Sequence, residues 1–149
     1  MSAVVPLSTL LDARQVWRGR TPPLPAGEQP TGWAALDAVL PTGGWPDAAL
    51  SEILLPADGV GELRLLLPTL ARLSRTARPV MLIAPPYVRC VAGGQKHHVD
   101  MHGVEIVSAA ERDVLWAMEQ CLRSGSCAAV LAWPHQADDR ARRRLQVAA

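Results

Sequence analysis

The stretch VEIVSAAERDVLWAMEQCLRSGSCAAVLAWP, residues 104–134, contains a predicted strand, a helix and a second strand in direct succession. Residues 104–107 and 128–133 are short apolar runs, which are typical of strands buried on both faces. Between them apolar side chains recur at helical spacing, and Gly125 follows at the position of a C-terminal helix glycine. The predicted apolar face comprises Val114, Leu115, Met118, Cys121 and Leu122.

The start of this helix and two further strands can also be predicted. Ser108 and Glu111 have the spacing of a capping box. Earlier in the chain, LSEILL at 50–55 and VMLIA at 80–84 are apolar runs that predict two more buried strands. Because apolar strands alternate with helical segments, the chain predicts an α/β fold with a mainly parallel sheet and helices on both faces.

Three more helices complete the predicted domain. Thr31 is the expected N-cap of a helix over 31–40, whose inward residues are Trp33, Leu36 and Leu40. Leucines recur at helical spacing over 62–75, where Pro68 should kink the helix or end its first part. The last helix spans 138–148, with Ala141, Leu145 and Ala148 expected inward.

The N-terminal residues predict a separate arm. Residues 7–17 have the apolar spacing of a short helix, and residues 20–30 contain four prolines. We therefore expect an N-terminal helix and Pro-rich arm over 1–30, followed by the α/β domain over 31–149.

Composition limits the functional class. The chain has 149 residues, of which 49% are hydrophobic, so it can bury one core. A net charge of +1 gives no overall attraction to nucleic acid. Three cysteines are too few for a disulfide framework. No secretory signal or membrane span is evident, which predicts a cytoplasmic protein without membrane contact.

A strand, a glycine-containing loop and a helix form the usual phosphate-binding unit of α/β proteins, and LPADGVGEL at 55–63 has this arrangement. A working P-loop needs Lys and then Ser or Thr after its last glycine. Here Gly59 and Gly61 are followed by Glu62 and Leu63. An ordinary strand-to-helix turn explains the same residues, and neither interpretation predicts a bound cofactor.

The residues around this loop resemble RecA. Thr31-Gly32, Leu36-Asp37, Gly43-Gly44, Pro46 and Glu52-Ile53 follow the order of the RecA segment before its P-loop, and Arg123-Ser124-Gly125 precedes a strand as in RecA. The resemblance implies a RecA-like fold. It also places Trp133 at the magnesium-binding Asp position and Ala84-Pro85-Pro86 at the catalytic Glu position, so no catalytic residue is expected.

Within the RecA-like group the chain resembles the ImuA family of translesion-synthesis accessory proteins. The motifs are VWRGR (16–20), TGWAALDAVLPTGGWP (31–46), LSEIL (50–54), GVGELRLLLPTLARLS (59–74), APPY (84–87), DVLWAMEQCLRSGSCAAVLAWP (113–134) and RRLQVAA (143–149). SulA, the division inhibitor, is a more distant relative that typically lacks the first two motifs. Residues 88–98 depart from the ImuA pattern, and the chain stops where that family continues, which predicts a C-terminally truncated fold.

Several polar and aromatic residues are candidate contacts. Those for a protein partner or DNA are Trp17, Arg18, Arg20, Trp45, Arg140, Arg142, Arg143 and Arg144. Core packing of the tryptophans and a solvated arginine face are the alternatives. His97, His98, Asp100 and His102, with Cys90, fit no familiar zinc spacing, so we expect a solvated loop and no metal site.

The resemblance implies a non-catalytic adaptor in SOS-induced mutagenic translesion synthesis, with ImuB, the error-prone polymerase and RecA as partners. One alternative is a SulA-like division inhibitor that binds FtsZ. A weak nucleotide-binding ATPase is the other, supported by the strand–loop–helix order alone. Weak DNA contact and homo-oligomerisation remain open at this stage.

Overall fold

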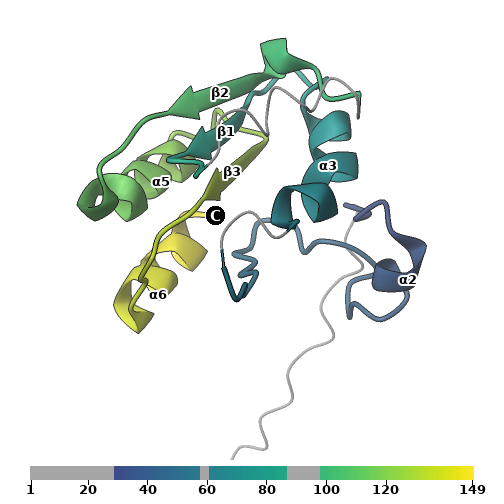
Figure 1. The fold of residues 1–149 in the computed structure, drawn as a ribbon, viewed down its shortest axis with the longest axis horizontal. Helices are drawn as coiled ribbons and strands as arrows, with labels where there is room; N and C mark the ends of the chain where they lie inside the picture. The colour runs from purple at the N-terminus through teal and green to yellow at the C-terminus, as the bar shows by residue number, and fades with distance from the viewer. Residues whose placement is uncertain (1–28, 58–60, 87–97) are drawn as a thin grey trace, which may run out of the picture.

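The computed structural model describes residues 29–57, 61–86 and 98–149. Within these residues the chain forms a three-stranded parallel sheet of order β2-β1-β3 (Figure 1). The strands are β1 (Val80–Ile83), β2 (Val104–Val107) and β3 (Ala129–Ala132). β1 pairs with both neighbours in register, so that Val80 faces Val104 on one side and Ala129 on the other. The predicted α/β class and parallel pairing are confirmed.

Helices cover both faces of this sheet. α3 (Glu62–Leu73) lies on one side, and α5 (Val114–Arg123) and α6 (Asp139–Ala148) lie on the other (Figure 1). Alternate residues of a strand point to opposite faces. Leu82 accordingly packs in the cluster that includes the α3 leucines, whereas Ile83 packs with Val114, Met118 and Leu145. Two cores therefore share one strand.

The leucine-rich helix is continuous across its proline. Leu63, Leu66, Leu67, Leu70 and Leu73 all belong to the core cluster under α3, as their spacing predicts. Pro68 does not end the helix, which runs from Glu62 to Leu73 with the proline inside it. The exposed indole Nε1 of Trp33 donates to the carbonyl oxygen of Leu65 within this helix, at 2.9 Å.

The predicted strand at 50–55 is wrong, because these residues form no strand ladder. Ile53 and Leu55 are half-buried, but Leu54 is 83% exposed. α6 contacts the segment through side chains: Leu50 N–H donates to Gln146 Oε1 at 3.1 Å. An apolar run predicts burial, whereas a strand also needs a neighbouring backbone to pair with, and the pattern does not supply that information.

Two helix starts also differ from prediction. In place of the predicted helix over 31–40, the structure has the short α2 (Ala34–Asp37), whose N-cap is Trp33 and not Thr31. Before α5, a 3₁₀ turn η3 (Glu111–Asp113) begins after Ala110 without a side-chain cap, so the predicted capping box does not form. The carboxylate of Glu111 instead accepts the backbone N–H of His135, at 3.0 Å.

The other predicted elements are confirmed with small changes at their ends. Gly125 follows α5 with φ +63°, the left-handed backbone of a C-terminal glycine. Asp138 is the N-cap of α6, and its side chain accepts the N–H of Ala141 at 2.7 Å. A 3₁₀ turn, η2 (Met101–Gly103), leads into β2. The predicted helix at 7–17 and all but the end of the Pro-rich arm lie outside the described residues.

Residues 29–46 pack against α3 as a connected segment. Gln29 forms a bridge with Trp45, and the indole Nε1 of Trp45 donates to Thr69 Oγ1 at 2.9 Å. Thr31 is fully buried, and its N–H donates to Asp37 Oδ1 at 2.9 Å. Hydrogen bonds within the segment and to the helix thus hold residues 29–46 against α3.

Gly32 fits this segment against Pro68. Gly32 has φ +85°, and a Cβ added there would lie 2.3 Å from the Cβ of Pro68. We predict that Gly32→Ala destabilises the protein by more than the ~1–2 kcal/mol of a left-handed backbone alone, because the methyl group would also clash with the proline. Urea unfolding followed by circular dichroism would measure the loss.

Gly43→Ala is the matched control for this experiment. Gly43 has φ +70°, but an added Cβ would meet no atom within 4 Å. Both variants therefore lose the same free energy from a left-handed backbone, but only Gly32→Ala adds a clash with Pro68. Equal losses of unfolding free energy would contradict the packing of residues 29–46 on α3.

Candidate functional site

The loop predicted as a degenerate P-loop leads into α3, and the described chain resumes there at Gly61. Glu62 is the first residue of the helix and is only 6% exposed. Its Oε2 accepts the backbone N–H of Gly61 at 3.1 Å. A helix N-terminus attracts anions through its unpaired N–H groups and its dipole. Here one of the chain's own carboxylates lies at that end, close to where a bound phosphate would lie. Gly59 is outside the described residues.

The two other positions compared with RecA lie just beyond the carboxyl ends of β1 and β3. Ala84 follows β1 with φ +48°, and its N–H donates to Val107 O at 2.9 Å. Trp133 follows β3, is half-buried and packs against the cluster under α3. A methyl group and an indole supply no oxygen ligand for magnesium, which prefers carboxylates and water.

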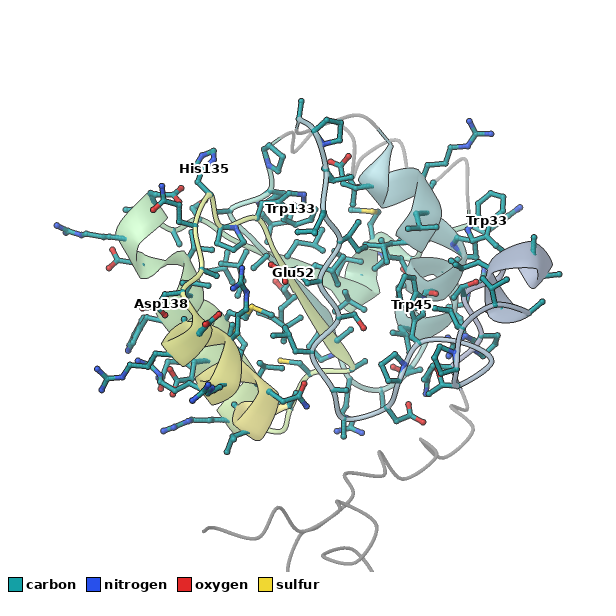
Figure 2. The ribbon with its side chains drawn as sticks, turned by 90° about the horizontal axis from the view of Figure 1, so that it is seen from below. Trp33, Trp45, Glu52, Trp133, His135 and Asp138 are labelled. Carbon is teal, nitrogen blue, oxygen red and sulfur yellow. The ribbon has the colours of Figure 1, made fainter. Side chains whose placement is uncertain are left out.

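His135 and Glu111 join the loop after β3 to η3. Besides the backbone hydrogen bond, His135 Nε2 lies 3.5 Å from Glu111 Oε2, and both side chains are exposed. Figure 2 shows His135, Trp133, Glu52 and Asp138 around the end of β3 and the start of α6. The contact between Glu111 and His135 holds the loop after β3 at the carboxyl edge of the sheet. Glu111 therefore has this role and not the predicted one of a helix cap.

The arginines of α6, predicted as partner or DNA contacts, divide into two pairs. Arg142 lies 3.1 Å from Asp139 and 3.2 Å from Glu52, and Arg144 pairs with Glu119. Arg140 and Arg143 are exposed and form no ion pair with the residues that the structure describes. Two of the four candidates thus have structural partners, and the other two remain available to an external one.

Glu119 is the centre of an ion-pair cluster that the sequence analysis missed. It is buried on α5, and Arg123 Nη2 lies 2.9 Å from its Oε1. Arg144 Nε on α6 donates to its Oε2 at 3.0 Å. The hydrogen bond from Arg144, then the charges of Arg144 and Arg123, lower the pKa of Glu119 against the opposing effect of burial. Helical spacing alone could not reveal this cross-helix contact, because Arg144 comes from another element.

The remaining candidates lie mostly outside the described chain. Trp17, Arg18 and Arg20 are all in residues 1–28. Trp45 is half-buried, and its indole N–H is bonded to Thr69, which gives it a structural role (Figure 2). The segment 88–98 is described only at His98.

No metal site forms from the side chains that the structure describes: no three His, Cys, Asp or Glu residues gather around one point. Asp100 caps η2 by accepting the N–H of His102 at 3.0 Å. His98 has φ +64°, and its carbonyl oxygen accepts from Arg75. Cys90 and His97 lie outside the described residues. Over the same described ranges, no helix has the length and apolar character to cross a membrane.

Comparison with solved structures identifies a protein of similar fold. No protein-family model matches the chain, and a search of curated proteins finds no significant match. Among solved structures, the chain is similar to SulA from Pseudomonas aeruginosa, with a TM-score of 0.58 and 29% sequence identity. The match covers 70% of this chain and 89% of the SulA chain. The findings support a place in a SulA-related superfamily of α/β proteins.

The ion-pair cluster predicts how stability depends on pH. The pKa of Glu119 in the folded protein lies below its ordinary value of 4.5. The ion pairs of Glu119 therefore make their full contribution to the free energy of unfolding above pH 4.5. It is lost as the pH falls through the folded-state pKa. We expect Glu119→Gln to lower the melting temperature at pH 7, and the difference from the unsubstituted protein to shrink steadily toward pH 3.

Thermal unfolding at several pH values would measure this difference. Glu105→Gln is the matched control, since Glu105 is exposed on β2. A melting-temperature difference for Glu119→Gln that stays constant from pH 7 to pH 3 would show that its loss is one of packing and not of charge.

Proposed function

We propose that this chain is a non-catalytic, SulA-like protein of the DNA-damage response that binds FtsZ and restrains cell division. The observation that carries the proposal is the structural similarity to SulA, which extends over 89% of that protein. The Leu-rich helix and the Arg123-Ser124-Gly125 helix end, which resemble SulA in sequence, also support this function. Both features belong to the described fold, as α3 and the end of α5.

Absence of catalysis is the second part of the proposal, and Glu62 supports it. A carboxylate about 4 Å from a phosphate charge costs roughly 4 kcal/mol at an effective dielectric constant of 20. A millimolar ligand has only about 4 kcal/mol of binding free energy. Glu62 alone would therefore offset weak nucleotide binding at the start of α3. Trp133 and Ala84 provide no compensating magnesium or catalytic group.

A second candidate, the ImuA-type adaptor in translesion synthesis, is favoured by residues 29–46. This segment contains the TGWAALDAVLPTGGWP motif, which SulA typically lacks. It is an integrated part of the fold: Thr31 and Thr42 are buried, and Arg72 on α3 donates to Pro30 O at 3.3 Å. A segment held in this way can present a surface that a SulA-like protein without it would not have.

Pull-down of the tagged full chain from a damage-induced bacterial lysate separates the two candidates. Recovery of FtsZ, together with inhibition of assembly of purified FtsZ and cell filamentation on overexpression, is the expected result. Recovery of ImuB, the error-prone polymerase or RecA in place of FtsZ would favour the adaptor. Recovery of neither set would overturn both candidates.

The arginines of α6 offer a matched pair of variants for the same experiment. We expect Arg140→Ala with Arg143→Ala to reduce capture of the partner, because exposed charges at an interface mainly accelerate association. Arg112→Ala removes another exposed arginine, from η3; its side chain is 88% exposed and lies 3.5 Å from Asp113. Equal capture by both variants would exclude this face of α6 as the contact.

Nucleotide binding provides an independent check on the absence of catalysis. We expect the protein to show no saturable binding of a fluorescent ATP analogue up to millimolar concentration. Glu62→Lys removes the repelling charge and supplies the cation of a P-loop. Binding that appears only in this variant would show that the loop retains its frame, whereas binding by the unsubstituted protein would contradict the proposal.

A further inference from the structure

Two cysteines meet at the turn between α5 and β3. Cys121 lies in the last turn of α5, and Cys127 lies two residues before β3 begins. Gly125, with φ +63°, reverses the chain between them. Cys127 Sγ donates to the carbonyl oxygen of Cys121 at 3.6 Å, so the reversal returns the second side chain to the backbone of the first. Both residues are half-buried and unoxidised.

Serine hydroxyls hold this turn in place. Ser124 Oγ donates to the same Cys121 carbonyl at 2.7 Å and lies 2.7 Å from Ser126 Oγ. Ser126 Oγ is in turn 3.9 Å from Cys127 Sγ. Burial raises the pKa of the Cys121 thiol, and the neighbouring Cys127 raises it further. The hydrogen bond from Cys127 Sγ to the Cys121 carbonyl oxygen thus places the two cysteines side by side at this turn.

We propose that Cys121 and Cys127 form an intramolecular disulfide when the protein meets a low-molecular-weight disulfide, and that the reverse reaction with a dithiol restores the thiols. The two cysteines lose two protons and two electrons as the Sγ–Sγ bond forms. The oxidant gains them, and its own S–S bond breaks to give two thiols. The proposal does not depend on the protein's partner.

Closure proceeds by two thiol–disulfide exchanges. Only the thiolate attacks a disulfide, and the raised pKa of Cys121 makes its thiolate scarce. One cysteine attacks the oxidant and releases one small thiol. The thiolate of the other then attacks the first Sγ in the mixed disulfide and releases the second. Closure joins the end of α5 to the start of β3.

Peptide mapping of the full chain tests this pairing. The protein is incubated with oxidised glutathione, free thiols are blocked with N-ethylmaleimide, and trypsin is added without a reductant. Cleavage after arginine and lysine puts Cys121 in peptide 113–123, Cys127 in peptide 124–140 and Cys90 in peptide 90–96. We expect peptides 113–123 and 124–140 to be linked, and dithiothreitol to separate them.

Single variants provide the controls. Cys90→Ser should keep the linked peptides, whereas Cys121→Ser should stop at a glutathione adduct on Cys127. In the unsubstituted protein, closure should accelerate about tenfold per pH unit while Cys121 remains mostly protonated. Circular dichroism establishes that each variant is folded. Links that involve peptide 90–96, or glutathione adducts alone at every pH from 7 to 9, would overturn the proposal.

Discussion

The structure depends on β1, which is hydrogen-bonded to a parallel strand on each side and is covered on both faces. Val80, Leu82 and Ile83 have no exposed surface. Their alternation sends Val80 and Leu82 to the cluster under α3, and Ile83 to the cluster under α5 and α6. A strand in this position has no polar face, which is why its sequence is continuously apolar. Every described helix except the short α2 packs against a core that includes a residue of β1.

This arrangement explains which elements were predictable from the sequence. β1, β2 and β3 are predominantly apolar runs and all three form strands. Only β1 is buried over most of its length, because Glu105 and Ile106 of β2 are exposed and β3 is half-buried. Residues 50–55 have the same composition but lack a backbone neighbour, so composition predicted a strand that does not form. Glu111 has the right spacing for a cap, yet its carboxylate bonds to His135, which is distant in sequence. Local patterns thus identified the elements that local forces determine, and failed where a contact comes from another part of the chain.

The same distinction applies to the candidate site. The place of Glu62 directly after Gly61, at the start of α3, could be predicted from the local sequence, whereas its effect on nucleotide binding stays a prediction. The roles of the α6 arginines could not be predicted, because a run of arginines on one helix gives no information about the acids on its neighbours. Arg142 and Arg144 contact Glu52 and Glu119, which are 90 and 25 residues away. Only Arg140 and Arg143 then retain the external role that the sequence suggested for all four.

The contacts that α3 makes with the rest of the chain are relevant to both candidate functions. At its N-terminus the carboxylate of Glu62 accepts the backbone N–H of Gly61. Along its outer side, Pro68 lies against Gly32, and Thr69 and Arg72 bond to residues 29–31 and Trp45. If the protein binds no nucleotide, as we propose, α3 can support an additional segment of the protein without cost to catalysis. Whichever partner binds, the surface that distinguishes this chain from a SulA-like protein without residues 29–46 is therefore the one built on α3.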